Sequence, residues 1–314
     1  MIPERFLSRL FVLGTRGSTL AITQANIVRD ALLTRFPDVR IEIRVIRTQG
    51  DEPSHSRRGG DHPNPILPSG EGIFVRSIER ALLAGRIDFA VHSFKDMPSV
   101  APSEFALGAF PVRDDPRDAL VTRSGQTLTL LPKGAMIGTG SPRRRALLLD
   151  ARPDLVVEPV RGNVDTRLRS VSGSNLEGVI LAAAGLRRLG RESEITELLD
   201  PRVFVPAIGQ GTLAVEARSD DETTLELVRS IDDAKSRACA LAERAVAVKV
   251  QAGCSTPVAA FARLQGQRIE INAFILAADG RTLVRAELSG PSDQPEKIGA
   301  QLGDVLLAGY LVPN

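Results

Sequence analysis

Short apolar stretches that suit buried strands alternate, over the first 230 residues, with segments whose apolar residues recur at helical spacing. In the first part of this region, strands are predicted at residues 11–15, 40–47 and 87–91, and helices at residues 19–36 and 74–82. Gly85 is placed to end the second helix. This β-α-β-α order predicts a parallel sheet with helices on its faces, which is an α/β fold.

A second region with the same alternation begins after residue 111. Its predicted strands cover residues 135–138, 155–160 and 179–183, and its predicted helices begin at Ser141-Pro142 and, after a cap at Asn163, at residue 164. Strands predicted at residues 204–205 and 213–217 would return the chain to the first region. A chain that leaves one α/β domain, builds a second and returns crosses twice between them, so we expect a cleft between the two domains.

The pattern changes at about residue 232, where an Ala-rich stretch begins. Helices are predicted over residues 235–250 and 295–307, and strands over residues 258–264, 268–276 and 282–289. Hairpin signals at Gly266-Gln267 and Asp279-Gly280 make these strands an antiparallel sheet. The sequence therefore predicts two α/β domains, residues 1–111 with 208–230 and residues 112–207, and a C-terminal α+β domain over residues 231–314. Residues 51–72 are rich in Gly and Pro and are expected to form a long loop.

Composition narrows the class of protein. Hydrophobic residues make up 43% and charged residues 25% of the 314 residues, which is typical of a globular protein. The net charge of +2 argues against a polycation that coats nucleic acid, and the absence of Trp gives little support to a stacking platform for single strands. No stretch of about 18 apolar residues could span a membrane. Glu4, Arg5 and Arg9 interrupt any apolar leader, so we expect a cytoplasmic protein.

Arginine is the preferred basic residue: of 40 Lys and Arg, only five are Lys. Codon usage could explain this preference, and so could a need for bidentate recognition of carboxylates or phosphates. Four loops at the carboxyl ends of predicted strands combine glycine with arginine, and they carry Arg16, Arg143 to Arg145, Arg161 with Arg167, and Arg187 with Arg188. Ligands of open α/β sheets bind at that edge, and helix N-termini there favour anions. A polyanion-binding cleft is one interpretation, and unrelated surface arginines are the other.

Few residues could carry out covalent or acid–base chemistry. Asp96 follows a predicted strand and Lys95, so it could stabilise a developing cation or could simply pair with the lysine. His92 is expected to be a strand residue with a satisfied imidazole. Cys239, within a predicted helix, is expected to pack, whereas Cys254 lies in a bent loop and could be inert or a nucleophile. Two cysteines provide neither a disulfide framework nor a zinc site, and we expect no metal.

Seven stretches together resemble the porphobilinogen deaminase (hydroxymethylbilane synthase) family and cover all three predicted domains in order. They are GTRGSTLA (14–21), DFAVHSFKDMPS (88–99), GTGSPRRRALL (138–148), VRGNVDTRL (160–168), LAAAGLRRLG (181–190), PAIGQGTLAVE (206–216) and ERAVAVKVQAGCSTPVAAFA (243–262). The resemblance implies two periplasmic-binding-protein-like α/β domains plus a C-terminal α+β domain that carries the cofactor. It also implies an enzyme that joins four porphobilinogen molecules head to tail, with loss of ammonia, into hydroxymethylbilane for tetrapyrrole biosynthesis.

The resemblance also assigns roles to individual residues. A dipyrromethane cofactor, itself made from two porphobilinogens, would be attached by a thioether to Cys254, and Asp96 would be the catalytic residue beside the pyrrole nitrogens. Cofactor-holding positions are Lys95, Ser141, Arg143 and Arg144, and positions for the substrate and the growing chain are Arg16, Ser18, Arg161, Arg167 and Arg188. Each pyrrole carries an acetate and a propionate, so many arginines are expected. We expect a monomer whose partner is this small substrate, without nucleic acid or membrane.

The sequence departs from the family pattern in one loop. Where the family usually has GGKGLF with another lysine a few residues earlier, this chain has SGEGIF (69–74) with Leu67 at the earlier position. Glu71 thus places a negative charge where a positive one is usual. Two alternatives to the full enzyme stay open: a two-domain clamp that binds an anionic ligand without chemistry and, because of this loop, a weakened family member.

Overall fold

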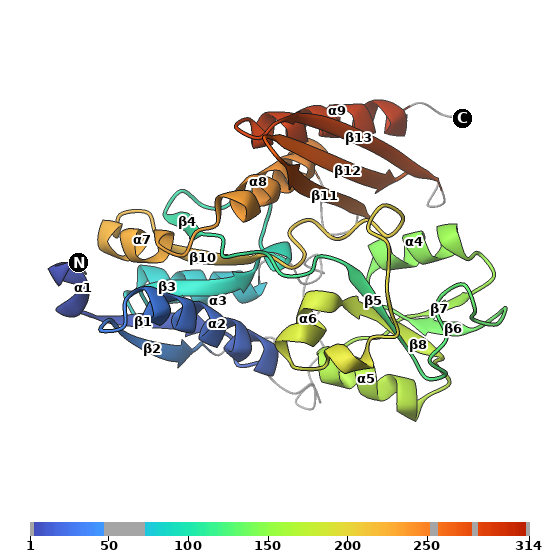
Figure 1. Cartoon of the computed structure of the whole chain (residues 1–314), viewed down its shortest axis with the longest axis horizontal. Helices are drawn as coiled ribbons and strands as arrows, with labels where there is room; N and C mark the ends of the chain where they lie inside the picture. The colour runs from blue at the N-terminus through green and yellow to red at the C-terminus, as the bar shows by residue number, and fades with distance from the viewer. Residues whose placement is uncertain (1–2, 47–72, 252–256, 278–281, 312–314) are drawn as a thin grey trace, which may run out of the picture. The chain divides into compact units, whose positions relative to one another are not determined.

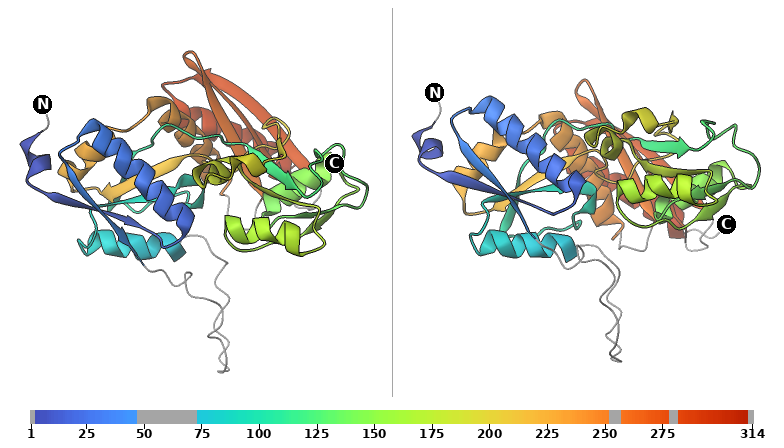
Figure 2. Two further views of the ribbon diagram at one scale, coloured as in Figure 1. Left: turned by 60° about the horizontal axis from the view of Figure 1, so that its bottom comes forward. Right: turned by 90° about the horizontal axis from the view of Figure 1, so that it is seen from below.

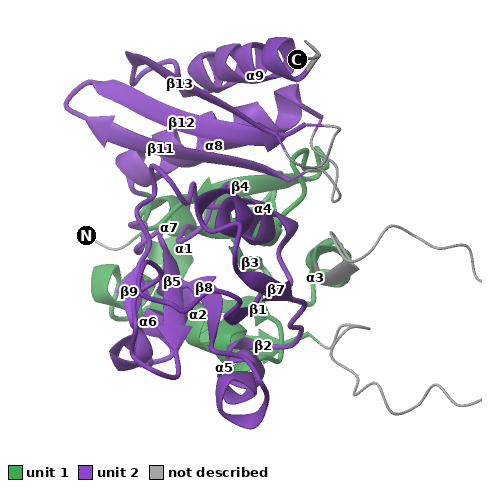
Figure 3. Ribbon diagram, turned by 90° about the vertical axis from the view of Figure 1, so that its right-hand side faces the viewer, with its two compact units in different colours: residues 1–111, 213–232 green, residues 112–212, 233–314 purple. Residues whose placement is uncertain are grey.

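The structure is a computed structural model that describes residues 3–46, 73–251, 257–277 and 282–311. Within these ranges the strands form three sheets (Figure 1). The chain divides into two compact units, Met1–Pro111 with Leu213–Asp232 and Val112–Thr212 with Asp233–Asn314 (Figure 3). The predicted α/β class and the antiparallel C-terminal sheet are confirmed by two mixed five-stranded sheets and one three-stranded antiparallel sheet. The predicted three-domain boundaries stay a prediction.

Unit 1 is built on a five-stranded sheet of order β2-β1-β3-β10-β4. β1 is parallel to β2 and β3, whereas β10 returns from later in the chain and runs antiparallel to β3 and β4. The strands are β1 (Leu10–Thr15), β2 (Arg40–Val45), β3 (Phe89–Ser93), β4 (Phe105–Ala109) and β10 (Leu213–Arg218), and the helices are α1 (Glu4–Leu7), α2 (Thr19–Arg35), α3 (Ile73–Leu83) and α7 (Glu222–Arg229). α2 and α3 cover opposite faces of this sheet (Figure 2).

Local sequence explains how these elements begin and end. The side chain of Ser18 caps α2 by accepting a hydrogen bond from the amide of Ala21 at 3.3 Å. The chain leaves α3 through Gly85, whose φ of +63° lies in the left-handed region. Gly14 lets β1 pass close to its neighbour, because a Cβ there would lie 2.3 Å from Cδ1 of Ile87.

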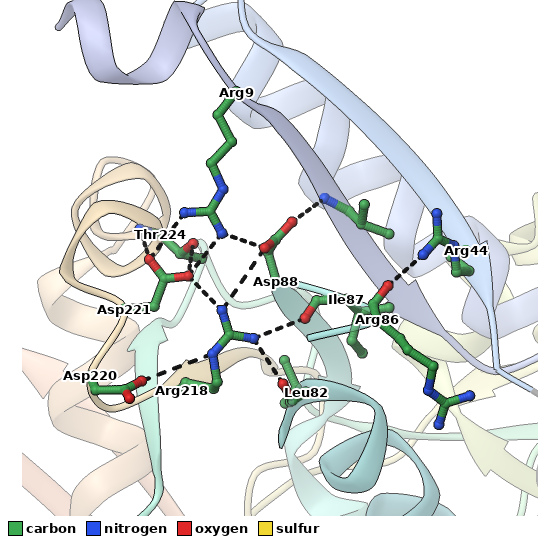
Figure 4. Close-up of polar contacts among 11 residues, drawn as sticks. Arg9, Arg44, Leu82, Arg86, Ile87, Asp88, Arg218, Asp220, Asp221 and Thr224 are labelled. Carbon is green, nitrogen blue, oxygen red and sulfur yellow. Dashed lines mark hydrogen bonds and ion pairs between the residues drawn. The ribbon is translucent and has the colours of Figure 1, made fainter. Parts of the chain in front are cut away.

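An arginine–aspartate cluster closes the end of this sheet at which β1 begins (Figure 4). Arg9 pairs with Asp88 and, at 2.9 Å, with Asp221, which also accepts a hydrogen bond from Arg218 at 2.8 Å. Arg218 further donates to the carbonyl oxygen of Leu82 at 2.8 Å. The cluster thus ties β1, β10 and the N-cap of α7 together.

Unit 2 contains a five-stranded sheet of order β7-β6-β8-β5-β9 and a three-stranded antiparallel sheet of order β11-β12-β13. Its strands are β5 (Asp118–Thr122), β6 (Met136–Gly138), β7 (Val156–Glu158), β8 (Gly178–Ala182), β9 (Glu197–Leu198), β11 (Val258–Gln265), β12 (Arg268–Leu276) and β13 (Leu283–Pro291). Its helices are α4 (Pro142–Ala151), α5 (Val164–Gly173), α6 (Ala183–Arg188), α8 (Ala234–Lys249) and α9 (Pro295–Leu311).

Both faces of the C-terminal sheet contribute residues to the hydrophobic cores of unit 2. Ala260 and Ala262, on one face of β11, pack in a core with α8 and α9. Ala259 and Phe274, on the other face, join the core of the five-stranded sheet around Leu120. One face of the sheet is therefore apolar along its length, whereas the other is apolar around Ala259 and Phe274 and carries exposed polar residues such as Arg263 and Glu287. The apolar part of this second face explains why the sheet belongs to the same compact unit as the second α/β sheet.

Most predicted elements are present with ends that differ by a few residues, but the strand predicted at residues 204–205 is wrong. Phe204 and Val205 are buried in a segment between β9 and β10. The carbonyl oxygen of Val205 accepts a hydrogen bond from the side chain of Arg143 at 2.6 Å. The sequence analysis also missed α1, β4, β5, α6, β9 and α7. The hairpin signal at Asp279-Gly280 lies outside the described residues, whereas Gly266 does join β11 to β12.

Candidate active site

A pocket of about 280 Å³ lies at the carboxyl ends of β1 and β3 in unit 1. Arg16 and Ser18 contribute from the turn after β1 and the start of α2, and Lys95 and Asp96 contribute from the residues after β3. The structure thus brings four predicted site residues of unit 1 to one pocket. This is the edge of an α/β sheet at which ligands bind.

Two contacts of neighbouring residues hold the turn that carries Asp96. It is a single 3₁₀ turn, η2 (Phe94–Asp96), in which Lys95 and Asp96 are exposed and Phe94 is buried. The ring of Phe94 packs edge-to-face on Phe110, with 5.0 Å between the ring centroids. One residue earlier, the hydroxyl of Ser93 accepts a hydrogen bond from the side chain of Gln24 on α2 at 2.9 Å. The packing of Phe94 and the hydrogen bond to Ser93 therefore hold the backbone that leads to Asp96.

His92 also lines this pocket, and its partner is Glu216, which the sequence analysis did not identify. Nε2 of His92 lies 3.0 Å from a carboxylate oxygen of Glu216, and the side chain of Glu216 is fully buried. His92 is on β3 and Glu216 on β10, so the pair joins two antiparallel neighbours of the sheet. The expected role of His92 as a strand residue with a satisfied imidazole agrees with this contact.

The pocket combines two cationic side chains with one carboxylate. Arg16 and Lys95 can bind carboxylate groups of a ligand, and Arg16 offers the planar fork that matches them. Asp96 can accept a hydrogen bond from a ring N–H and stabilise a positive charge that develops nearby. This set of groups suits a ligand that carries several carboxylates and a reacting centre that becomes cationic.

The predicted cofactor-holding residues of unit 2 lie at the start of α4. Ser141 is the N-cap, and its hydroxyl accepts a hydrogen bond from the amide of Arg144 at 3.4 Å. The side chains of Arg143 and Arg144 are both buried and converge on Asp118, a fully buried residue on β5. Burial lowers the pKa of Arg144, and the nearby charge of Arg143 lowers it further, whereas Asp118 raises it. The sequence analysis missed Asp118 because nothing in its local sequence indicates these partners.

The other predicted arginines of unit 2 differ in burial. Arg161 is exposed in the loop between β7 and α5, and Arg167 on α5 donates to the carbonyl oxygen of Gly162 at 2.9 Å. Arg188 at the end of α6 is buried, donates to the carbonyl oxygen of Gly211 at 2.6 Å and lies 3.4 Å from Asp114. Burial lowers the pKa of Arg188, although Asp114 opposes this shift.

The two cysteines can be assessed only in part. Cys239 is buried in α8, where burial first, and then the charge of Glu243, raises the pKa of its thiol to about 11. This agrees with the expected packing role and argues against a reactive thiolate. Cys254, Leu67 and Glu71 lie outside the described residues.

Comparisons with known proteins cover nearly the whole chain. Residues 11–226 match the family model of the porphobilinogen deaminase dipyromethane cofactor binding domain, and residues 237–308 match that of the porphobilinogen deaminase C-terminal domain. The chain belongs to the porphobilinogen deaminase family. A porphobilinogen deaminase of Roseiflexus sp. is 44% identical over 301 residues, which are 96% of this chain and 97% of that protein. One of Sorangium cellulosum is 45% identical and covers 95% of this chain and 98% of its own.

Among solved structures, a periplasmic binding protein of Salmonella typhimurium with high arginine specificity covers 71% of this chain at 16% identity, with a TM-score of 0.39. The fold of this porphobilinogen deaminase family member is therefore assigned from the strand order and pairing of its own sheets. The family polymerises porphobilinogen into hydroxymethylbilane in tetrapyrrole biosynthesis, and its larger domain binds a dipyrromethane cofactor.

The residues of this chain fit that cofactor. Its two pyrrole rings carry acetate and propionate groups, and guanidinium groups are the donors that bind such carboxylates in pairs of parallel hydrogen bonds. Arg143 and Arg144 place two guanidinium groups next to only one carboxylate, that of Asp118. Donors and charge therefore suit the group that the family binds.

Proposed function

We propose that this chain performs the family reaction in the pocket of unit 1, with Asp96 as the catalytic residue. The observation that carries the proposal is the presence of Asp96, Lys95 and Arg16 in one pocket at the carboxyl ends of β1 and β3. Loss of ammonia from porphobilinogen leaves positive charge on the carbon next to the ring. The carboxylate of Asp96 stabilises that charge and accepts a hydrogen bond from the pyrrole N–H.

The cationic side chains hold the carboxylates of the substrate and the cofactor. Arg16, Ser18, Arg161, Arg167 and Arg188 bind the substrate and the growing chain; Lys95, Ser141, Arg143 and Arg144 hold the dipyrromethane; and Cys254 is its point of attachment. When bound, the cofactor supplies the pyrrole carbon to which the first substrate is joined. Charge-assisted hydrogen bonds of this kind contribute about 1.5–3 kcal/mol each, so several of them can bind a chain of anionic rings.

The mass of the intact protein tests the attachment site. After expression in a host that makes porphobilinogen, the protein is expected to carry the added mass of a dipyrromethane, and peptide mapping is expected to place it on Cys254. The Cys254→Ser variant is expected to have unmodified mass, whereas Cys239→Ser is the matched control and is expected to keep the addition. A wild-type protein of unmodified mass would instead favour the clamp that binds an anion without chemistry.

Substitution of Asp96 tests the chemistry. Asp96→Asn keeps the size and the exposed position of the side chain, so folding and cofactor content are expected to be unchanged while turnover falls at least about 100-fold, the scale of a lost electrostatic contact at a reacting centre. Asp220→Asn, at a side chain that is 88% exposed on unit 1, is the control. Product formation by Asp96→Asn at the rate of this control would remove Asp96 from the mechanism.

Arg161→Leu tests the anion-binding role. It is expected to raise KM for porphobilinogen, and the difference from wild type is expected to shrink at high salt because salt screens exposed charges. Arg169→Leu on α5 is a matched change at a second exposed arginine of the same segment, and it is expected to leave KM unchanged. Equal KM values for both variants would place Arg161 outside the binding surface.

We further propose that the protein acts as a cytoplasmic monomer without a nucleic-acid or membrane partner. In the described part of the chain, no helix has the length and apolar character needed to cross a membrane. The net charge of +2 gives little electrostatic attraction to nucleic acid. Sedimentation analysis is expected to give a single species of 33.7 kDa before cofactor addition, and a stable dimer would contradict the proposed monomer.

A further inference from the structure

The interior of unit 2 contains a charged cluster in which two arginines share one aspartate. Asp118 accepts hydrogen bonds from Arg143 at 2.8 and 3.0 Å and from Nε of Arg144 at 3.0 Å. Gln210, in the segment before β10, donates to the same carboxylate at 2.9 Å and to the carbonyl oxygen of Pro116 at 2.7 Å. All four side chains that meet here are buried.

The charges of this cluster do not balance. Asp118 is ionised, because burial would raise its pKa but the two guanidinium groups lower that pKa far below its ordinary value. The remaining partners of the arginines are neutral: the carbonyl oxygens of Val205 and Ile180 and the side chain of Gln210. Two guanidinium groups and one carboxylate therefore leave a net charge of +1 in the interior, and a buried charge without a partner is costly.

A second arginine–aspartate cluster has no surplus of positive charge. In unit 1, Arg9 and Arg218 meet two largely buried aspartates, Asp88 and Asp221, and Arg218 also lies 3.9 Å from the exposed Asp220, so positive charge is not in excess there (Figure 4). A cluster that joins strands can thus form without surplus positive charge in this same chain. The surplus around Asp118 consequently calls for a different explanation from the need to join β5 to α4.

We propose that Asp118 is a positioning residue that keeps Arg143 and Arg144 ionised and oriented in the interior while leaving one positive charge for a carboxylate of the dipyrromethane. The inference rests on the proposed cofactor role of these two arginines. Asp118 itself need not touch the cofactor. It supplies half of the compensating charge before the cofactor arrives, and Gln210 fixes its carboxylate through a neutral hydrogen bond.

This role predicts an energetic coupling between residue 118 and the cofactor. Asp118→Asn raises the surplus from one charge to two, so the cofactor-free protein should lose more stability than the cofactor-bound protein, in which a ligand carboxylate supplies compensation. Arg143→Met removes the surplus and should have the opposite effect. The measured quantity is the difference between the melting temperatures of the bound and free forms, which are prepared from hosts that can and cannot make porphobilinogen and checked by intact mass.

The expected results differ in sign between the two variants. Relative to wild type, the difference in melting temperature should grow by about 4–8 °C in Asp118→Asn and should shrink in Arg143→Met. Asp221→Asn is the control, since it makes the same chemical change at an aspartate with two arginine partners in the cluster of unit 1, and it should lower both melting temperatures equally. If cofactor-free Asp118→Asn does not fold, a folded bound form still supports the coupling, and Arg143→Met remains measurable.

Two failures can be told apart. If wild-type protein carries the dipyrromethane and neither variant changes the bound-minus-free difference, or if both change it in the same direction, the positioning role of Asp118 is overturned while the proposed function stands. If the wild-type protein from the competent host has unmodified mass, the proposed cofactor attachment is overturned, and the inference falls with it.

Discussion

Glu243 offers the sharpest test of how unit 2 is held together. This glutamate on α8 is fully buried and accepts four hydrogen bonds. Arg113 donates two of them, at 2.6 and 3.2 Å, and the backbone amides of Gly209 and Ala262 donate the others at 2.7 and 2.8 Å. One carboxylate thus joins α8 to β11, to the residues before β5 and to the residues before β10.

Glu243→Gln keeps the size of the side chain but removes its charge and one of its two acceptor oxygens. In either orientation, the new NH₂ group faces two donors, and the buried guanidinium of Arg113 loses its counter-charge. An orphaned buried donor costs about 1–3 kcal/mol, and breaking a buried ion pair costs about 3–5 kcal/mol. Because these two costs overlap, we expect a loss of about 3–5 kcal/mol in the free energy of unfolding.

Thermal and denaturant unfolding of purified protein measure this loss. At about 2–4 °C per kcal/mol for a domain of this size, the melting temperature should fall by roughly 10 °C. Glu270→Gln is the matched control, because Glu270 pairs with Arg263 at 2.9 Å on β12 and β11 but both side chains are partly exposed, so its loss should stay below about 1 kcal/mol. If Glu243→Gln lowers the melting temperature no more than the control does, the ion pair and hydrogen bonds of Glu243 are not a source of stability.

Two further predictions concern unit 1. Burial opposes ionisation of Asp221, but hydrogen bonds from Arg9 and Thr224 lower its pKa from 3.8 to about 2. The ionised form therefore stabilises the fold above pH 4, and up to about 2 kcal/mol of the free energy of unfolding should be lost as the pH falls toward 2. In acid titrations of stability, Asp221→Asn should flatten this dependence on pH. His92→Leu should lower the free energy of unfolding by about 3–5 kcal/mol because Glu216 is left buried without its partner. Adding Glu216→Leu should recover most of that loss in a double-mutant cycle. Additive losses would show that the two side chains do not interact.

The parts of the fold that the sequence analysis predicted are those specified by neighbouring residues. Ser18, Ser141 and Asn163 each cap the helix that follows, and each cap depends on a side chain only three residues from the amide it binds. Alternating apolar residues located β12 at its observed bounds. The pocket of unit 1 could be anticipated because its residues follow two parallel strands of one sheet, whose carboxyl ends meet at one edge.

The parts that the sequence analysis missed depend on residues far apart in the chain. Glu216 meets His92 across 124 positions, and Asp118 meets Gln210 across 92. No local pattern marks such partners: Asp118 precedes an apolar stretch as many surface residues do, and it is buried only because α4 brings two arginines over it. The strand predicted at residues 204–205 failed for a related reason, because a carbonyl oxygen in that segment accepts from Arg143 instead of from a strand.

The abundance of arginine also has an explanation that neither sequence interpretation considered. Arg123 donates to the carbonyl oxygens of Val171, Ser174 and Leu176 at 2.5–2.8 Å, where α5 ends and the chain turns toward β8. Arg152, after α4, does the same at two further carbonyl oxygens. A guanidinium group has five N–H donors in a fixed plane, so one residue can satisfy several backbone acceptors that helices and turns leave unpaired. Counting arginines therefore overstates the anion-binding surface, and the arginines that matter for a ligand are those whose charge the chain itself leaves uncompensated.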